Sequence, residues 1–156
     1  MKTIEQVSAV VEEALLSLGI TPEQARNEEE GQWTVYREVL EIYMDAWTLG
    51  TEQQALFYFQ ADDQPVFQVI CPFCQVPAEQ YEEFLEELLD VNIALYKVSL
   101  AVRQEGGVVC VKYRSLAQNL TKEEVLEALD AVAYYAELFS NVFREKYGVQ
   151  ILERQD

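Results

Sequence analysis

The sequence predicts an α+β fold of two layers, in which helices pack against an antiparallel sheet. Apolar residues recur at helical intervals near both ends of the chain and once in the middle, and aromatic and β-branched residues fill the stretches between them with a period of two. The elements follow in the order α-β-β-β-α-β-β-α, which is typical of a two-layer fold. No repeat or linker interrupts the 156 residues, so we expect one domain over residues 1–156.

The first helix begins after Thr3, because Gln6 follows at the spacing of a capping box. Gly19 ends the helix in the usual position after its last turn. The polar stretch Ile20–Gly31 has no clear period, and we expect a loop there, with room for one short turn of helix after Pro22. Helical spacing places the following apolar residues on one side of the first helix: Ile4, Val7, Val10, Val11, Ala14, Leu15 and Leu18.

Three strands are predicted next, over Trp33–Trp47, Ala55–Gln60 and Val66–Cys71, where the period changes to two. The first is long for a single strand, so we expect a bend or bulge near Arg37-Glu38. Residues Val39–Trp47 also fit a helix, and that alternative stays open at this point. Neither face of these strands is plainly polar, which indicates that something covers the second face: the loop Ile20–Gly31, a second subunit or a segment of a partner.

The second helix is expected to open with Pro77, a residue favoured in a first helical turn. Its glutamates lie on the side away from the apolar residues, so we expect a solvated face there rather than a carboxylate metal site. The apolar side of this helix consists of Tyr81, Phe84, Leu85, Leu88 and Leu89.

A hairpin with strands Ala94–Gln104 and Val108–Arg114 follows, because Gly106-Gly107 favours a two-residue turn of type I′. That turn places Arg103 opposite Cys110. One face is then apolar, with Tyr96, Val98, Leu100, Val102, Val109, Val111 and Tyr113. The other carries four basic residues, Lys97, Arg103, Lys112 and Arg114.

The last helix begins at Thr121, where Glu124 completes a second capping box, and it ends at Gly148. Its apolar residues cover a wide arc. We expect it to be the main helix packed on the sheet.

Charge and composition narrow the function. The chain has 11 Lys plus Arg against 28 Asp plus Glu, a net charge of −17, and no His. Nucleic acid and anionic membranes are poor partners for such a chain, and catalysis through a His-containing triad is excluded. No stretch reaches the ~20 apolar residues of a membrane span, and acidic residues interrupt any leader-like start, so we expect a cytoplasmic protein with reduced cysteines.

Several phrases of the second half resemble the YbjN-like family, which is similar in fold to the type III secretion chaperones. The resemblance implies a small, acidic, often dimeric protein-binding fold, and it brings no catalytic residues. It covers residues 76–147 in pattern and the whole chain in element order and acidity. The phrases are Leu88-Leu89-Asp90-Val91-Asn92, Lys97-Val98-Ser99-Leu100, Gly107-Val108-Val109 and Leu120-Thr121-Lys122-Glu123-Glu124-Val125.

Cys71-Pro72-Phe73-Cys74 is the one motif that suggests chemistry, since a CxxC at a helix start lowers the pKa of a thiol and supports disulfide exchange. Here no Lys or Arg lies within twenty residues on either side, and the next helix starts no earlier than about Pro77. We therefore expect both cysteines to pack at a strand end. Thiol-disulfide or metal-dependent activity is the alternative, and a zinc site would need Cys110 and a carboxylate, or a second chain.

The sequence thus favours a non-enzymatic protein-binding module, chaperone-like or regulatory, without a cofactor or a metal. We expect a homodimer with an additional, unidentified protein partner. Aromatic and apolar side chains among polar neighbours are the expected contacts, and the basic strand face is expected to lie near acidic surface of this chain or its dimer mate. The expected contact residues are Tyr43, Trp47, Tyr58, Tyr81, Phe84 and Leu88.

Overall fold

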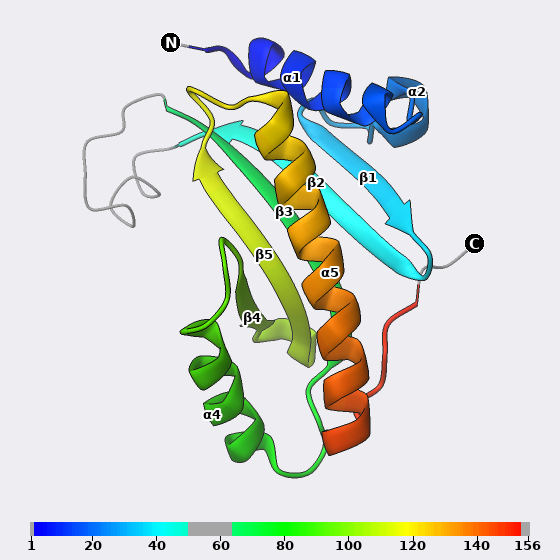
Figure 1. The fold of residues 1–156 in the computed structure, drawn as a ribbon, viewed down its shortest axis with the longest axis vertical. Coiled ribbons are helices and arrows are strands. Elements are labelled where there is room, and N and C mark those ends of the chain that lie inside the picture. Colours follow the sequence, from blue (N-terminus) through cyan, green and yellow to red (C-terminus); the bar gives the residue numbers. More distant parts are fainter. Residues whose placement is uncertain (1, 50–63, 154–156) are drawn as a thin grey trace. The chain divides into compact units, whose positions relative to one another are not determined.

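The structure is a computed structural model that describes residues 2–49 and 64–153. The described strands form one sheet in the order β1-β2-β3-β5-β4, with neighbours running in opposite directions (Figure 1). The predicted α+β class is therefore confirmed. In chain order the elements are α1 (Ile4–Ser17), α2 (Pro22–Ala25), β1 (Gln32–Arg37), β2 (Leu40–Thr48), β3 (Pro65–Gln75), α4 (Tyr81–Asn92), β4 (Ser99–Arg103), a short 3₁₀ turn (Glu105–Gly107), β5 (Val108–Leu116) and α5 (Lys122–Tyr147).

The predicted long first strand is two strands. The chain reverses at Glu38 and Val39, with Glu38 in the left-handed region at a φ of 54°, so a full turn replaces the predicted bend. Residues 40–48 form β2, and the helical alternative for Val39–Trp47 is wrong. The predicted strand Ala55–Gln60 lies outside the described residues.

The hairpin of β4 and β5 forms with a longer loop than predicted. Arg103 pairs with Val108 rather than with Cys110, which leaves residues 104–107 as the loop. Because this shift is by an even number of positions, each side chain within the paired residues keeps its predicted face. Strand β4 is also shorter than the predicted Ala94–Gln104, since Lys97 has a φ of 63° and cannot continue a strand.

The helix ends follow local chemistry. Thr3 and Gln6 form the predicted capping box of α1, and the backbone N–H of Glu124 donates to the side chain of Thr121 ahead of α5. Helix α4 begins at Tyr81 rather than at Pro77. Gln80 has a left-handed φ of 59°, which breaks any helix that would run on from Pro77.

The described chain divides into two compact units. The expectation of one domain over residues 1–156 stays a prediction. The first unit consists of Met1–Thr34, Met44–Gln68 and Arg114–Glu127, and the second consists of Val35–Tyr43, Val69–Tyr113 and Ala128–Asp156.

In the first unit, Glu12 joins helix α1 to the start of β1. Its carboxylate accepts hydrogen bonds from Arg26 at 2.5 and 2.6 Å and from the indole Nε1 of Trp33 at 3.1 Å. The Arg26 hydrogen bonds are the main reason why the pKa of Glu12 lies below its usual value. Trp33 itself is 2% exposed, so this contact fixes one of the largest side chains of the core.

Gly31 allows a close backbone approach in the same unit. The N–H of Ala46 donates to the carbonyl of Gly31 at 2.8 Å, and Gly31 has a φ of 78°. A Cβ at this position would lie 2.5 Å from the carbonyl oxygen of Ala46. Only glycine therefore fits without a shift of the backbone.

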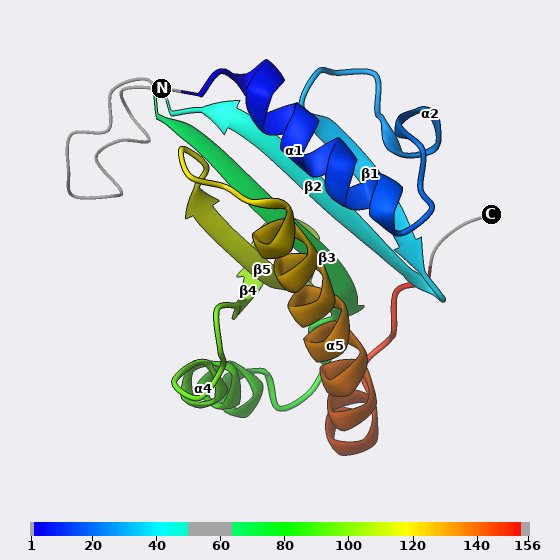
Figure 2. The ribbon, with the colours of Figure 1, turned by 45° about the horizontal axis from the view of Figure 1, so that its top comes forward.

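In the second unit, aromatic rings connect α4, α5 and β3. The ring of Phe84 meets those of Phe143 and Tyr147 edge to face, with centroids 5.1 and 5.2 Å apart, and Phe143 also stacks on Phe73. Phe73, Phe84 and Phe143 are fully buried. In both ribbon views, these last turns of α5 lie at the same end of the second unit as α4 (Figure 2).

Asn92 ties the end of α4 to strand β4. Its Nδ2 donates to the carbonyl of Leu100 at 3.0 Å, and the N–H of Leu100 donates to its Oδ1 at 2.6 Å. The amide side chain thus replaces a neighbouring strand at this residue, because both backbone groups of Leu100 point away from β5. The asparagine of the Leu-Leu-x-x-Asn phrase therefore has a structural role.

Replacing Asn92 by Ala should lower the free energy of unfolding by about 1–3 kcal/mol, because both backbone groups of Leu100 lose their partner. Urea unfolding of the variant measures the loss. Asn119→Ala is the control, since Asn119 is exposed. Equal stability of the two variants would contradict the role given to Asn92.

Gly31→Ala should destabilise the protein more than Gly19→Ala. Both glycines have a left-handed φ, near 78° and 79°, so both substitutions cost about 1–2 kcal/mol of backbone strain. Only Gly31 has a backbone atom in the way, whereas a Cβ at Gly19 meets nothing within 4 Å. The difference in thermal stability between the two variants measures the cost of the contact between the new Cβ and the backbone of Ala46. Equal losses of stability would show that the backbone does not approach Gly31 closely.

Candidate protein-interaction surfaces

Helix α4 carries an exposed apolar stripe on the side away from the core. Tyr81, Leu89, Ile93 and Tyr96 are 46%, 71%, 86% and 63% exposed, and we call these four residues the α4 stripe. The first three are multiples of four positions apart, so they follow one side of the helix and its C-terminal end. Isolated exposed apolar residues are ordinary, but three along one side of a helix are typical of an interaction surface.

The predicted contact residues of α4 divide between its two sides. Phe84 and Leu88 are 0% and 4% exposed and belong to the core of the second unit, whereas Tyr81 lies in the α4 stripe. Phe84→Glu would therefore test folding rather than association. The signal for the outward side was present in the sequence, because residues 81, 85, 89 and 93 form a second apolar series beside 84 and 88.

Tyr96 was expected on the inner apolar face of the hairpin, and this is wrong. The residue precedes β4 and is among the most exposed apolar side chains of the described chain. Its ring lies beneath the ammonium of Lys97, 5.3 Å from the centroid. The left-handed backbone of Lys97 is the reason why the strand pattern does not extend to Tyr96.

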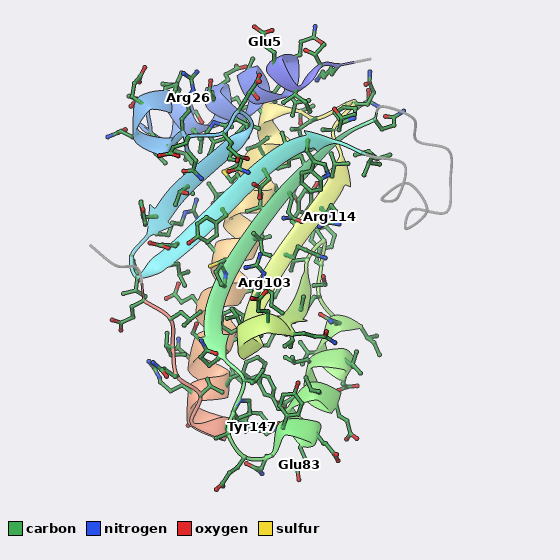
Figure 3. The ribbon with its side chains drawn as sticks, turned by 180° about the vertical axis from the view of Figure 1, so that it is seen from behind. Glu5, Arg26, Glu83, Arg103, Arg114 and Tyr147 are labelled. Atoms are coloured by element: carbon green, nitrogen blue, oxygen red, sulfur yellow. The ribbon has the colours of Figure 1, made fainter. Side chains whose placement is uncertain are left out.

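A second candidate surface is the sheet face that no described helix crosses when the strands are seen from behind (Figure 3). In the first unit this face carries Arg114, whose Nε and Nη2 donate to Oε1 of Gln68 at 2.9 and 2.5 Å. The guanidinium lies 5.2 Å from the centroid of the Trp47 ring. Burial raises the pKa of the neighbouring Asp45, while a hydrogen bond from Gln68 and the charge of Arg114 act in the opposite direction.

Trp47, a predicted contact residue, is half-buried on this face. It packs against a small apolar cluster with Leu49, Val66 and Leu116. Its indole Nε1 is buried and has no acceptor among the described residues. Tyr58, predicted to belong to the same surface, lies outside the described residues.

Tyr43, another predicted contact residue, lies in the part of β2 that belongs to the second unit. Its hydroxyl donates to Oε2 of Glu41 at 2.6 Å, and burial together with this bond raises the pKa of Tyr43 to about 12. Part of the loop that was one expected cover of the second face bonds to the edge of β1 in the first unit, where the N–H of Asn27 donates to the carbonyl of Gln32.

Three of the four basic residues predicted on one strand face lie in the strands, Arg103 in β4 and Lys112 and Arg114 in β5. Arg103 and Lys112 lie in the second unit on the same face of β4 and β5, and both charges act on the thiol of Cys110. Lys97 lies outside β4, and Arg114 belongs to the first unit. Their predicted proximity to acidic surface stays a prediction.

Cys71, Cys74 and Cys110 are free and buried in β3 and β5. Burial is the main cause that raises the pKa of Cys71 and of Cys74 to about 12, opposite to the shift of a reactive thiolate. Within residues 2–49 and 64–153, no group of acidic, Cys or His side chains is arranged to hold a metal ion. Thiol-disulfide or metal-dependent activity at this motif remains the alternative to a binding function.

The folded protein should react slowly with a maleimide at neutral pH, and all three cysteines should react once it is unfolded. The free energy of unfolding should also fall as the pH rises from about 9 toward 12, since unfolded thiols ionise while Cys71 and Cys74 stay protonated in the fold. The variant with Cys71→Ala and Cys74→Ala should lose part of this pH dependence. Rapid labelling of the native protein at pH 6 would favour the thiol alternative.

No helix within the described part of the chain is long and apolar enough to cross a membrane. No curated protein matches the sequence.

Solved structures share the fold. A chain in the crystal structure of the ExsC–ExsE complex is 16% identical, with a TM-score of 0.64 over 90% of this chain and 96% of that one. A chain in the HopA1–SchA chaperone–effector complex is 7% identical, with a TM-score of 0.60 over 86% and 92%. The structure of the Yersinia pestis type III secretion chaperone SycH with a stable fragment of YscM2 gives 12% identity and a TM-score of 0.59 over 85% and 98%. The likeness at these identities is one of fold.

The sequence comparison is more specific. The family YbjN, described as "Putative bacterial sensory transduction regulator", matches residues 8–145, which is most of the chain. The resemblance seen in the sequence is thereby confirmed, and the chain belongs to the YbjN family.

Proposed function

We propose that this protein is a non-enzymatic protein-binding module, chaperone-like or regulatory, that acts in the cytoplasm as a homodimer joined through the α4 stripe. The observation that carries the proposal is the exposure of Leu89 and Ile93, 71% and 86%, in a chain with a net charge of −17. Exposed apolar side chains that follow one side of a helix are typical of an interaction surface.

The relatives support binding rather than catalysis. The solved structures of similar fold are complexes in which a chaperone or its like is held with another protein, and the family is described as regulatory. In this chain, the described surfaces with distinctive chemistry are apolar and aromatic. The three thiols that could take part in chemistry are buried. Shape and chemistry therefore favour recognition of a protein.

A second copy of the chain is the occupant that fits the α4 stripe. Beside it runs an acidic row of Glu82, Glu86 and Asp90, and Lys97 follows at the C-terminal end. If two α4 helices pack antiparallel about a two-fold axis near Leu89, Leu85 of each copy lies level with Ile93 of the other. The apolar rows then cover each other.

The open sheet face is the proposed surface for the other protein partner. Trp47 and Arg114 offer an aromatic ring and a stacked guanidinium, the residue types most enriched at the centres of interfaces. Tyr43 adds a second aromatic ring in its own unit. None of these three residues belongs to the α4 stripe. A dimer formed through the α4 stripe would therefore leave them available to bind the other partner.

Leu89→Glu or Ile93→Glu should give a folded monomer, whereas the wild type should be a dimer by light scattering over a micromolar to millimolar series. A charge in the centre of an apolar contact loses its hydration without gaining a partner. The control is Leu16→Glu, the same change at a side chain of α1 that is 53% exposed.

Circular dichroism should be unchanged in all three variants, because each position is on the surface. A wild type that is monomeric across the series, or a dimer that survives both α4 substitutions, would contradict the proposed contact.

A further inference from the structure

We propose that a groove in the second unit, between α5, the β1–β2 turn and the C-terminal segment, is a docking site for an extended peptide of a partner protein that carries aliphatic residues among lysines or arginines. The groove has a volume of 750 Å³. The inference rests on the proposed function as a binding module, and it adds a surface that shares no residue with the α4 stripe.

The floor of the groove is mostly apolar and consists of buried residues. Leu40, Ala133 and Ser140 line it and are 6%, 6% and 8% exposed. The hydroxyl of Ser140 donates back to the carbonyl of Ala136 at 2.6 Å, so its one donor is already used. Val39 and Tyr134 line the groove with 46% and 62% of their surface exposed. An aliphatic side chain on this floor would bury apolar surface that is otherwise in water.

The length of the groove favours a peptide over a compact small molecule. Its lining residues on α5 run from Asp130 to Arg144. At 1.5 Å per residue this stretch of helix is about 21 Å long. An extended chain of about six residues has the same length. A segment of that size places about three side chains toward the floor and three away from it.

The charged residues that line the groove indicate which polar residues the bound peptide carries. Four acidic residues line the groove, Glu38, Asp130, Glu137 and Glu153, against Arg37 and Arg144. Arg37 is already paired with Asp130 at 2.6 Å, and Arg144 donates to the side chain of Asn141 at 2.8 Å. Four carboxylates against two arginines leave the lining with a net charge of −2, which a cationic peptide complements.

Backbone hydrogen bonds hold the C-terminal wall in place. The N–H of Leu152 donates to the carbonyl of Phe73, and the N–H of Gln75 donates to that of Gln150, both at 2.9 Å. Ile151, which lines the groove, is thereby bridged to Cys74. The groove is thus formed before any occupant arrives, which reduces the entropy lost on binding.

A fluorescein-labelled hexapeptide of alternating lysine and leucine tests the site by fluorescence polarisation. Wild-type protein should bind it more tightly than the glutamate–leucine and lysine–serine hexapeptides. Glu137→Lys should weaken binding by roughly threefold to tenfold, the range expected when one surface charge pair becomes a repulsion. Tyr134→Ser should weaken it as well.

Matched controls lie on the same helix outside the groove. Glu145→Lys makes the same change of charge, and Val142→Ser removes a similar exposed apolar group. Neither should alter the affinity beyond twofold. Equal losses of affinity for Glu137→Lys and Glu145→Lys would show that the peptide is attracted only by the net charge of the protein, and would overturn the site. The site would also be overturned if the wild type did not bind the lysine–leucine peptide, or if it bound the glutamate–leucine peptide equally well.

Light scattering separates this proposal from the previous one. Glu137→Lys and Tyr134→Ser should remain dimers, because neither residue belongs to the α4 stripe. A dimer that fails to bind the peptide overturns the groove alone. A monomeric wild type that binds the peptide, and loses it in the groove variants, overturns the dimer while the groove stands.

Discussion

The packing of Phe84 against Phe143 and Tyr147 is the contact on which the proposed surfaces of the second unit depend. It fixes α4 to α5 with ring centroids 5.1 and 5.2 Å apart, and an ion pair between Lys146 and Glu87 lies beside it. Once Phe84 is buried, the helical period leaves Leu89 on the other side of α4, where it meets water. The core of this unit thus determines which apolar residues stay exposed. Exposure of the α4 stripe is a consequence of packing rather than an accident of composition.

The strong negative charge of the chain bears on how the exposed α4 stripe behaves in solution. Copies of a chain with a net charge of −17 repel each other, and this repulsion opposes nonspecific association. Salt screens it within about 8 Å at physiological ionic strength, so it does not prevent a contact between matched apolar surfaces. An acidic chain can therefore carry exposed leucine and isoleucine without aggregating. The same charge selects cationic peptides over acidic ones at the groove beside Glu137.

The parts of the fold that depend on neighbouring residues could be predicted from the sequence. The parts that depend on contacts between distant residues could not. Capping residues such as Thr3 and Thr121 determine helix starts through bonds three residues away, so both starts could be predicted. The turn at Glu38 could not, because alternation with a period of two continues through it and glutamate carries no turn signal. The α4 stripe was missed because two apolar series share one helix. The groove depends on Ile151 being bridged to Cys74, a pairing across the chain that no local pattern indicates.

Asn92 shows how one residue of a short phrase closes part of a sheet edge. Strand β4 is at the edge of the sheet, and edge strands are open to pairing with other chains through their backbone. The side chain of Asn92 occupies the outward N–H and carbonyl of Leu100, so this part of the edge is closed to another strand. The same residue ends α4, with Ile93 directly after it. The proposed recognition at this end of the second unit therefore uses the side chains of α4 rather than a backbone edge, and side chains discriminate between partners where a free strand edge accepts any extended chain.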